Sequence, residues 1–387
     1  MEQHTAKTAL VRCASYEREE VERALEQLLT LTDGLSFVQP GMRVVLKANL
    51  VMKKPPEAAC TTHPQVLAAL TRALVQRGAK VVVGDSPGGP FTERALRGIY
   101  RECGLDAVEQ AGAALNWDVE TESDFFEGGK VLRHIDVARF VKEADAVISV
   151  AKLKTHGMMG YTGAAKNLFG VIPGTMKAEY HYRMPNTAAF AAMLVDLAEY
   201  VSPALSIIDA VTGMEGDGPS HGDPRFVGGL IASTSPHYAD LVGSTLMGLS
   251  PEAVPTLKEA ISRGLCPAAL SEKDVAGESI SSLAVPDYKT IPPVKPLSSD
   301  FVHQKAWLKP FSKVVRGVLE QRPQVDPKLC VGCGECARAC PPKAIRIENR
   351  LPQIDREKCI RCFCCQELCP RAAMKIHRSR IARVVQK

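Results

Sequence analysis

Several features that would assign this chain to a special class of protein are missing from its 387 residues. No run of 18 consecutive apolar residues is present, so the sequence predicts no membrane span. Residues 1–7 lack the basic start and apolar core of a secretory signal, so we expect none. Aromatic residues make up only 5%, and a net charge of +5 is too small to indicate a nucleic-acid-binding protein. The composition is that of an ordinary globular protein.

Cysteine is abundant, and its distribution along the chain is uneven. Nine of the 13 cysteines lie between Cys330 and Cys369, and four are scattered over the rest of the chain. Disulfide frameworks are typical of short secreted chains. A crowded cysteine segment in a long chain without a signal peptide favours bound metal in a reducing compartment. We therefore expect a cytoplasmic metal-binding protein.

The crowded segment contains one cysteine pattern twice. The pattern C-x-x-C-x-x-C-x-x-x-C-P is formed first by Cys330, Cys333, Cys336 and Cys340 and then by Cys359, Cys362, Cys365 and Cys369. Paired C-x-x-C motifs also bind tetrahedral zinc, but the third cysteine and the final Cys-Pro favour iron–sulfur clusters. Cys364 is a ninth cysteine outside the pattern.

Residues 326–377 resemble the bacterial two-[4Fe–4S] ferredoxins. The resemblance implies a small α+β ferredoxin-like domain in which the fourth cysteine of each run binds the cluster of the other run. It implies one cluster on Cys330, Cys333, Cys336 and Cys369, and a second on Cys340, Cys359, Cys362 and Cys365. Electron transport through such clusters also implies a redox partner protein. The basic tail, 378–387, belongs to a stretch from Arg371 that is either a solvated extension or a docking strip for an acidic redox partner.

Residues 1–266 alternate between apolar runs and helical patterns. The continuous apolar runs at 80–83, 146–150 and 205–208 are typical of buried strands, and the stretches between them have helical periodicity. This alternation predicts an α/β domain that has a parallel sheet with helices on both faces.

Residues 267–325 break this alternation. The proline-rich stretch at 292–296 predicts a linker. Apolar residues at 307–319 predict a short helix, which either docks the ferredoxin segment onto the α/β domain or is a satellite helix without such a role.

Polar and glycine-rich segments follow the predicted strands, where parallel α/β sheets bind their ligands. A turn at 84–90 can present backbone amides to an anion, or can be only a tight turn. The segments 152–167 and 209–219 combine lysine, histidine and acidic residues with glycine. We expect them to bind a nucleotide or another anionic cofactor. The candidate binding residues are Ser86, Gly88, Gly89, Lys152, Lys154, Gly163, Asp209 and Glu215.

Three motifs in these segments resemble the family called domain of unknown function 362. They are Lys152-x-Lys154-Thr155-His156, Thr162-Gly163-x-x-Lys166-Asn167-x-x-Gly170 and Gly213-Met214-Glu215-Gly216-x-Gly218-Pro219. The resemblance covers most of residues 1–270, and it implies the joined ferredoxin segment that many members of the family carry.

The stretch from His156 to His181 has a fainter resemblance to the segment of lactate racemase that holds the nickel-pincer nucleotide. That resemblance implies that Lys166 tethers a cofactor, that His181 is a metal ligand, and that His63 and His156 form a proton-transfer pair. Ala164 stands where that family has a second glycine. The residues around His63 can also form a helix capping box.

The sequence therefore favours an iron–sulfur oxidoreductase. Electrons would pass through two [4Fe–4S] clusters to an unidentified small molecule in the α/β domain, with His63, His156, Lys166 and His181 as catalytic candidates. One alternative is a non-catalytic electron carrier with a docking domain, and another is a racemase- or isomerase-like enzyme with structural clusters. A convergent set of Lys, His and Glu favours a site over a docking domain.

Overall fold

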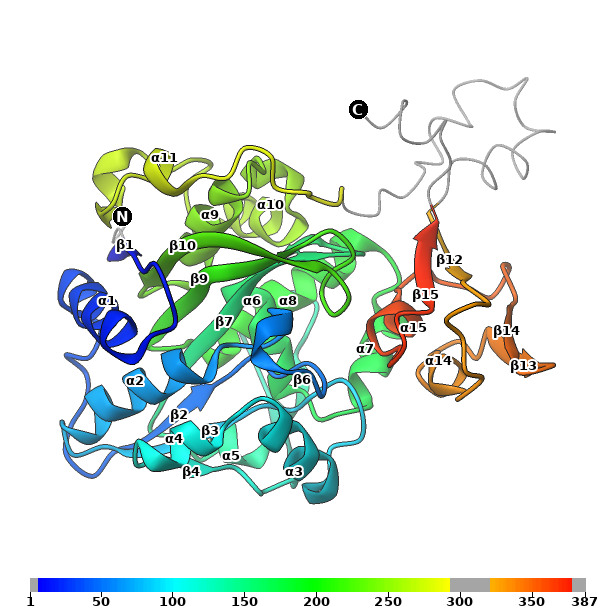
Figure 1. Ribbon diagram of the computed structural model, residues 1–387, viewed down its shortest axis with the longest axis horizontal. Coiled ribbons are helices and arrows are strands. Elements are labelled where there is room, and N and C mark those ends of the chain that lie inside the picture. Colours follow the sequence, from blue (N-terminus) through cyan, green and yellow to red (C-terminus); the bar gives the residue numbers. More distant parts are fainter. Residues whose placement is uncertain (1–5, 293–320, 378–387) are drawn as a thin grey trace.

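The computed structural model describes residues 6–292 and 321–377 (Figure 1). An α/β domain forms the larger part, and a small module formed by 321–377 lies beside it, near the helix α7 (Met176–Arg183). No helix in these two ranges is long and apolar enough to cross a membrane.

A mixed sheet of nine strands forms the centre of the α/β domain. The strands are β1 (Thr8–Arg12), β2 (Arg43–Lys47), β3 (Lys80–Gly84), β4 (Ala114–Leu115), β7 (Ala146–His156), β8 (Gly160–Thr162), β9 (Leu205–Glu215), β10 (Asp223–Ser233) and β11 (Ala276–Gly277). Their order is β11-β1-β10-β9-β7-β2-β3-β4, and β8 pairs with β7. The run from β9 to β4 is parallel, as the apolar strands predict.

The edge beyond β9 differs from the all-parallel prediction. β10 is antiparallel to both β9 and β1. Only residues 216–222 join β9 to β10, and so short a connection makes a hairpin, because a parallel pair needs a crossover of a dozen or more residues.

Helices cover both faces of the sheet, as expected. The helices are α1 (Arg18–Thr32), α2 (Pro64–Val75), α3 (Glu93–Glu102), α4 (Asp106–Gln110), α5 (Arg139–Lys142), α6 (Ala164–Asn167), α7, α8 (Thr187–Val201), α9 (Pro236–Leu246), α10 (Pro255–Ser262) and α11 (Ile280–Leu283), with 3-10 turns η1 (Pro56–Ala58), η2 (Leu168–Val171), η3 (Pro251–Ala253) and η4 (Glu272–Asp274). Val44 and Leu46 pack in one core with α1 and α2, whereas Val45 packs in another core with α8. This alternation along β2 follows from the two-residue period of a strand. A separate hairpin is formed by β5 (Thr121–Phe125) and β6 (His134–Ala138).

The strands β7 and β9 are longer than the sequence predicts. Their apolar runs end at 150 and 208, but the strands continue to His156 and Glu215. The extension of β7 pairs with β8, and that of β9 pairs with β10. Lys152, Lys154 and His156 therefore lie on a strand and not in a loop, and all three are buried.

Part of the predicted linker belongs to the α/β domain. Within 267–292, β11 pairs with β1, and Leu283 and Tyr288 are buried in the core beneath α9. The predicted helix at 307–319, most of the proline-rich stretch and the tail 378–387 lie outside the described residues.

The ferredoxin module has the internal symmetry that its duplicated sequence predicts. It comprises β12 (Arg322–Val325), α14 (Glu335–Arg338), β13 (Ile345–Glu348), β14 (Leu351–Ile354), α15 (Cys364–Glu367) and β15 (Met374–His377). β12 pairs with β15, and β13 pairs with β14, both antiparallel. Equivalent backbone hydrogen bonds join the two halves. The Asp326 amide donates to the Ala373 carbonyl, and the Asp355 amide donates to the Ala344 carbonyl.

Candidate functional site

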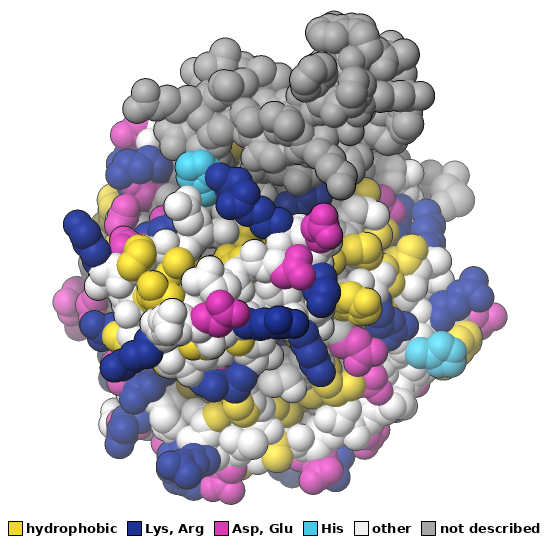
Figure 2. Space-filling model, turned by 90° about the vertical axis from the view of Figure 1, so that its right-hand side faces the viewer, with side chains coloured by type: hydrophobic (Ala, Val, Ile, Leu, Met, Phe, Trp, Pro, Cys, Tyr) yellow, Lys and Arg dark blue, Asp and Glu magenta, His cyan; other side chains and the backbone are white. Residues whose placement is uncertain are grey.

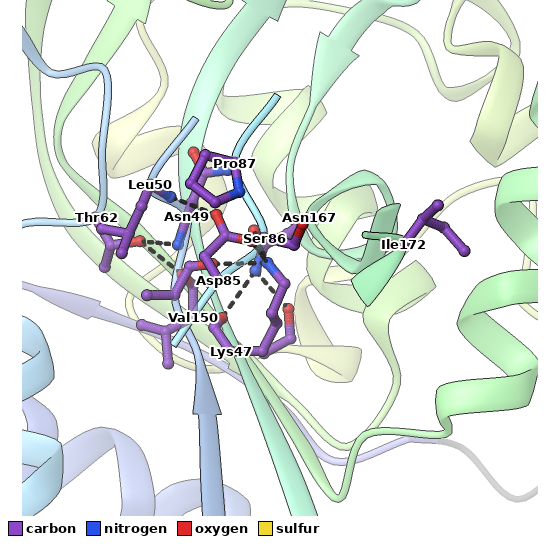
Figure 3. A network of polar contacts seen from close by, with 12 residues as sticks. Lys47, Asn49, Leu50, Thr62, Asp85, Ser86, Pro87, Val150, Asn167 and Ile172 are labelled. Carbon is purple, nitrogen blue, oxygen red and sulfur yellow. Dashed lines mark hydrogen bonds and ion pairs between the residues drawn. The ribbon is translucent and has the colours of Figure 1, made fainter. Parts of the chain in front are cut away.

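A buried ion pair joins the ends of β2 and β3. Lys47 Nζ lies 2.7 Å from Asp85 Oδ1 and donates to the Ala48 carbonyl (2.7 Å) and to Asn167 Oδ1 (3.3 Å) (Figure 3). Asp85 Oδ2 accepts from the Leu50 amide at 2.7 Å. Burial lowers the pKa of Lys47, and Asp85 opposes that effect. Since these groups bond to one another, we assign the pair a structural role.

The residues after Lys166 pack on this ion pair. Asn167 Nδ2 donates to the Lys47 carbonyl and to Ser149 Oγ, both at 3.0 Å, and so ties β2 to β7. A Cβ atom at Gly170 would collide with Lys47 Nζ and with Asp85 Oδ1. Two residues of the family motif, Asn167 and Gly170, thus fix the segment that carries Lys166.

A second group forms around β9. Lys152 Nζ lies 2.9 Å from Asp209 Oδ2 and donates to the Tyr16 hydroxyl at 2.7 Å. Tyr16 in turn donates to Asp209 Oδ1 (2.8 Å), and its ring stacks on that of His63 with centroids 3.6 Å apart. Lys152 and Asp209, both predicted to bind a cofactor, therefore bind each other.

His63 belongs to this second group and lies apart from the other predicted catalytic residues. Its Nδ1 accepts from the Gln65 amide at 3.3 Å, so the imidazole caps α2. The neighbouring Thr62 hydroxyl, which a capping box would use, donates instead to the Val150 carbonyl. Burial lowers the pKa of His63 to about 4, so the ring is neutral at pH 7.

The third group unites the three remaining catalytic candidates, and we call His156, Lys166 and His181 the pocket group. His156 Nδ1 accepts from the Met158 and Met159 amides at 3.1 and 3.2 Å, which assigns the ring proton to Nε2. That Nε2 is buried and has no hydrogen-bond partner among the described residues. Burial and then the charge of Lys166 lower the pKa of His156. Phe169 joins the other two residues, since its ring centre lies 5.7 Å from Lys166 Nζ and 5.7 Å from the His181 ring.

His181 and Lys166 also have free polar atoms. The His181 ring stacks on Phe190 at 4.2 Å, and its Nδ1 is buried without a partner in the described part of the chain. Burial and then Lys166 lower the pKa of His181 to about 3. Lys166 Nζ lies 5.7 Å from the centre of the Phe169 ring, and within residues 6–292 and 321–377 it makes no hydrogen bond. Burial lowers its pKa too. Within the described residues, none of these three polar atoms makes a hydrogen bond.

Two further lysines, of which Lys154 is buried and Lys177 is half-buried, border the pocket group. Lys154 Nζ donates to Asn49 Oδ1 (2.6 Å) and to the Cys60 carbonyl (2.7 Å), and burial lowers its pKa to about 8. Lys177 Nζ donates to the Ser86 carbonyl (2.7 Å) and to Ser86 Oγ (3.1 Å), and burial lowers its pKa to about 7. Ser86, predicted to bind an anion, thus holds Lys177.

Of the other predicted binding residues, Gly163 and Glu215 have packing contacts, whereas Gly89 has open space around it. A Cβ atom at Gly163 would collide with Asp240, whose carboxylate accepts from the Ala164 and Ala165 amides. Glu215 accepts from the Lys289 amide at 3.1 Å and so ties the segment around Lys289 to β9. A Cβ atom at Gly89 would meet nothing within 4 Å.

The second half of the ferredoxin module covers the pocket group. Glu367 Oε2 lies 3.8 Å from His156 Nε2, and Gln366 Nε2 donates to the Asp217 carbonyl at 3.0 Å. A Cβ atom at Gly88 would lie 2.7 Å from Leu368, and one at Gly157 would collide with Ile376. Gly88, predicted to bind an anion, therefore allows close approach of the module.

Two hollows in the module contain the cysteine sulfurs. One is lined by Cys330, Cys333, Cys336 and Cys369, and the other by Cys340, Cys359, Cys362 and Cys365. These are the two sets that the ferredoxin resemblance implies. The Ala344 and Ala373 amides each donate to a cysteine sulfur at 3.2 Å, as amides around cluster thiolates do. The donor set fits cubane clusters, in which each sulfur binds a different iron. Within the described ranges no group of three or more His, Cys, Asp or Glu is arranged for a single metal ion.

Sequence reasoning missed several residues of this region. Lys47 and Asn49 directly follow the apolar run of β2, so the rule for strand ends could have found them. Tyr16 follows β1, and only the fold brings it to Asp209. Glu367 gave one signal: in the duplicated pattern it stands where the first copy has Arg338.

Comparisons with known proteins match this division of the chain. Residues 44–245 match a family model described as a domain of unknown function (DUF362), and residues 322–370 match a 4Fe-4S dicluster domain. The chain is 36% identical over 268 residues to the thylakoid-associated protein sll1697 of Synechocystis sp., covering 67% of this chain and 80% of that protein.

Two solved structures share part of the architecture at 14% identity. One is the lactate racemase apoprotein of Thermoanaerobacterium thermosaccharolyticum, with a TM-score of 0.41 over 64% of this chain and 58% of that one. The other is a protein from Thermotoga maritima, with a TM-score of 0.35 over 60% of each chain. The chain spans less than two thirds of either structure, and neither likeness is close enough to transfer a residue's role. On the family match and the curated relative, the chain belongs to the DUF362 family and carries an iron–sulfur domain at its C-terminal end.

Proposed function

We propose that this protein is an iron–sulfur oxidoreductase in which two [4Fe–4S] clusters deliver electrons to a small molecule bound at the pocket group. One observation carries the proposal: the segment between the cluster cysteines Cys362 and Cys369 lies directly on that group. Glu367 Oε2 is 3.8 Å from His156 Nε2, and Cys364 is close enough to influence the pKa of Lys166. A molecule held by Lys166 would therefore lie beside the second cluster.

The pocket group has the chemistry for an anionic substrate or cofactor, including a nucleotide. Lys166 supplies a cation without a protein acceptor, and His156 Nε2–H supplies a hydrogen-bond donor. Burial strengthens both interactions, because water does not screen them. The bound clusters supply single electrons. The site residues then hold the acceptor, and Lys166 supplies a proton when the acceptor is reduced.

A second candidate is an electron carrier whose α/β domain only anchors the ferredoxin module. Lys152, Lys154 and Lys177 favour it, because their ammonium groups are bonded to protein acceptors and are not free for a ligand. The free ring nitrogens of His156 and His181 favour the oxidoreductase, because a domain that serves only for docking needs no buried polar groups without partners.

The test is anaerobic purification of the wild type and of Lys166→Met, which keeps the side-chain length but removes the charge. We expect about eight irons and eight sulfides in both proteins. We expect a small anion, detected by mass spectrometry of the denatured protein, to co-purify with the wild type only. Equal small-molecule content in the two proteins, or none in either, would favour the carrier.

The proposal includes a cytoplasmic location. None of the 13 cysteines, all of which lie in the described residues, forms a disulfide, and a reducing compartment maintains cysteines in this state. The curated relative is named as thylakoid-associated, so fractionation should examine both the cytoplasm and the membranes of the source cells.

A further inference from the structure

The two halves of the ferredoxin module share a cysteine pattern but differ in their surroundings. In the second half, Phe363 is 2% exposed and packs in the core of the α/β domain, and Cys364 and Gln366 are also buried. Their counterparts in the first half, 334, 335 and 337, are only partly buried. Among the described residues, the first half therefore leaves free the face that the second half uses for docking.

The charge at the matching position is inverted between the halves. Glu367 lies against His156 and acts on the pKa of Lys154 and Lys166, so its acidic group faces a basic surface. Arg338 occupies the equivalent place in the first half, and its side chain is 63% exposed. Arg338 pairs with Glu335 at 2.6 Å, but its exposed guanidinium still favours an acidic group on a protein that docks by the same geometry.

Apolar side chains surround the first cysteine loop at this free face. Leu329, Val331 and Ile347 are 42%, 49% and 37% exposed, and the last two line the hollow of the first cysteine set. Cys333 of that set is itself exposed. An apolar patch next to a redox centre is a place for a protein contact, because isolated exposed apolar residues are common but clusters of them are not.

Basic side chains surround the apolar patch. Arg371 lines the same hollow, and Arg350 packs against Gly332 in the cysteine loop. Residues 321–377 contain 11 Lys and Arg but only 6 Asp and Glu. Figure 2 views the molecule from the side of the module and shows hydrophobic side chains among basic ones, with some acidic ones.

We propose that this free face is the docking surface of an acidic one-electron carrier protein. Electrons would enter at the cluster of Cys330, Cys333, Cys336 and Cys369 and leave from the other cluster toward the pocket group. The inference rests on the proposed function and adds the partner and the direction of electron flow. Redox encounters use small interfaces, and charge complementarity raises their association rate.

Each transfer moves one electron and no proton. A reduced flavodoxin, which is an acidic carrier, loses one electron from its anionic flavin hydroquinone and becomes the neutral semiquinone. A [4Fe–4S]²⁺ cluster gains that electron and becomes [4Fe–4S]⁺. Charge and atoms balance without a further reagent.

The experiment measures the rate at which reduced flavodoxin reduces the reconstituted full chain. We expect Arg371→Glu to slow this second-order rate at low ionic strength, and Arg338→Glu/Arg371→Glu to slow it by roughly tenfold, since charge steering governs association. Salt should reduce the difference from wild type. Arg371 makes no hydrogen bond or ion pair in the described part of the chain, so its replacement leaves the fold unchanged.

The matched control is Arg346→Glu, on the alternate face of β13 from Ile347. It changes the net charge equally, and its rate should stay within about twofold of the wild type, as expected for a charge outside the contact. The affinity for oxidised flavodoxin, measured by flavin fluorescence anisotropy, should also fall in Arg371→Glu and in the double variant and stay near the wild-type value in Arg346→Glu.

The outcomes separate the two proposals. Equal slowing by Arg346→Glu and Arg371→Glu would overturn the docking surface, as would self-association through this face that Arg371→Glu abolishes in sedimentation. Clusters that a neutral photoreduced deazaflavin also fails to reduce would overturn the proposed function instead.

Discussion

At the scale of single residues, packing in the fold accounts for much of the family motif, and these residues need no catalytic role. Asn167, Gly170 and Gly163 were conspicuous in the sequence, and each packs against a buried charged group. The sequence could predict that polar residues gather at the strand ends. It could not predict which of them pair with each other, because Lys47 and Asp85 are brought together only by the sheet.

Gly170→Ala tests how tightly this packing constrains the site. The added Cβ would press on Lys47 Nζ and Asp85 Oδ1, so we expect a loss of about 1–3 kcal/mol in the free energy of unfolding. The measurement is anaerobic chemical denaturation followed by circular dichroism.

In the control variant we expect the free energy of unfolding to rise instead of fall. Gly98 lies inside α3, and a Cβ atom there would meet nothing within 4 Å. Gly98→Ala should raise stability by about 0.5–1 kcal/mol, because alanine is the better helix former. If the Gly170→Ala protein is as stable as the wild type, the Lys47–Asp85 pair can shift to make room for the Cβ atom without a loss of stability.

At the scale of helices and strands, apolar runs predicted where the strands of the sheet begin better than where they end. The extensions of β7 and β9 contain Lys152, Lys154 and Glu215, which a single-sequence pattern places in loops. Their strand conformation depends on pairing with β8 and β10, and that information is not local. The contact of α15 with the α/β domain was equally hidden, because it involves residues far apart in the chain.

The adjacent glycines Gly88 and Gly89 test that contact. Gly88→Val would push against Leu368, whereas a Cβ atom at Gly89 has open space around it. We expect Gly88→Val to speed amide hydrogen exchange in residues 363–369 and to leave the visible absorbance of the clusters unchanged. Gly89→Val should exchange like the wild type. Identical exchange in both variants would mean that the module does not rest on this turn.

At the scale of the whole molecule, the duplicated cysteine pattern predicted the module, but not which half faces the α/β domain. That orientation depends on residues such as Phe363 and Glu367, which differ from their counterparts in the first copy. The described structure also places β12 before the predicted start of the module at 326, and β12 pairs with β15. The module therefore needs residues 322–325 to complete its two small sheets.

A fragment of residues 321–377 should bind both clusters, and a fragment of residues 326–377 should bind them poorly, because it lacks the partner strand of β15. In the longer fragment we expect the second cluster to decay faster in air than in the full chain. Loss of the α/β domain exposes Leu368, Ile376 and Phe363, of which Phe363 lines the hollow of the second cysteine set, whereas the free face of the first cluster is unchanged. The decay of visible absorbance should thus become biphasic in the fragment, with about half of the signal in the fast phase, as two equal clusters require. A single phase with the rate of the full chain would show that the α/β domain does not shield the second cluster, and the electron path from that cluster to Lys166 would lose its structural basis.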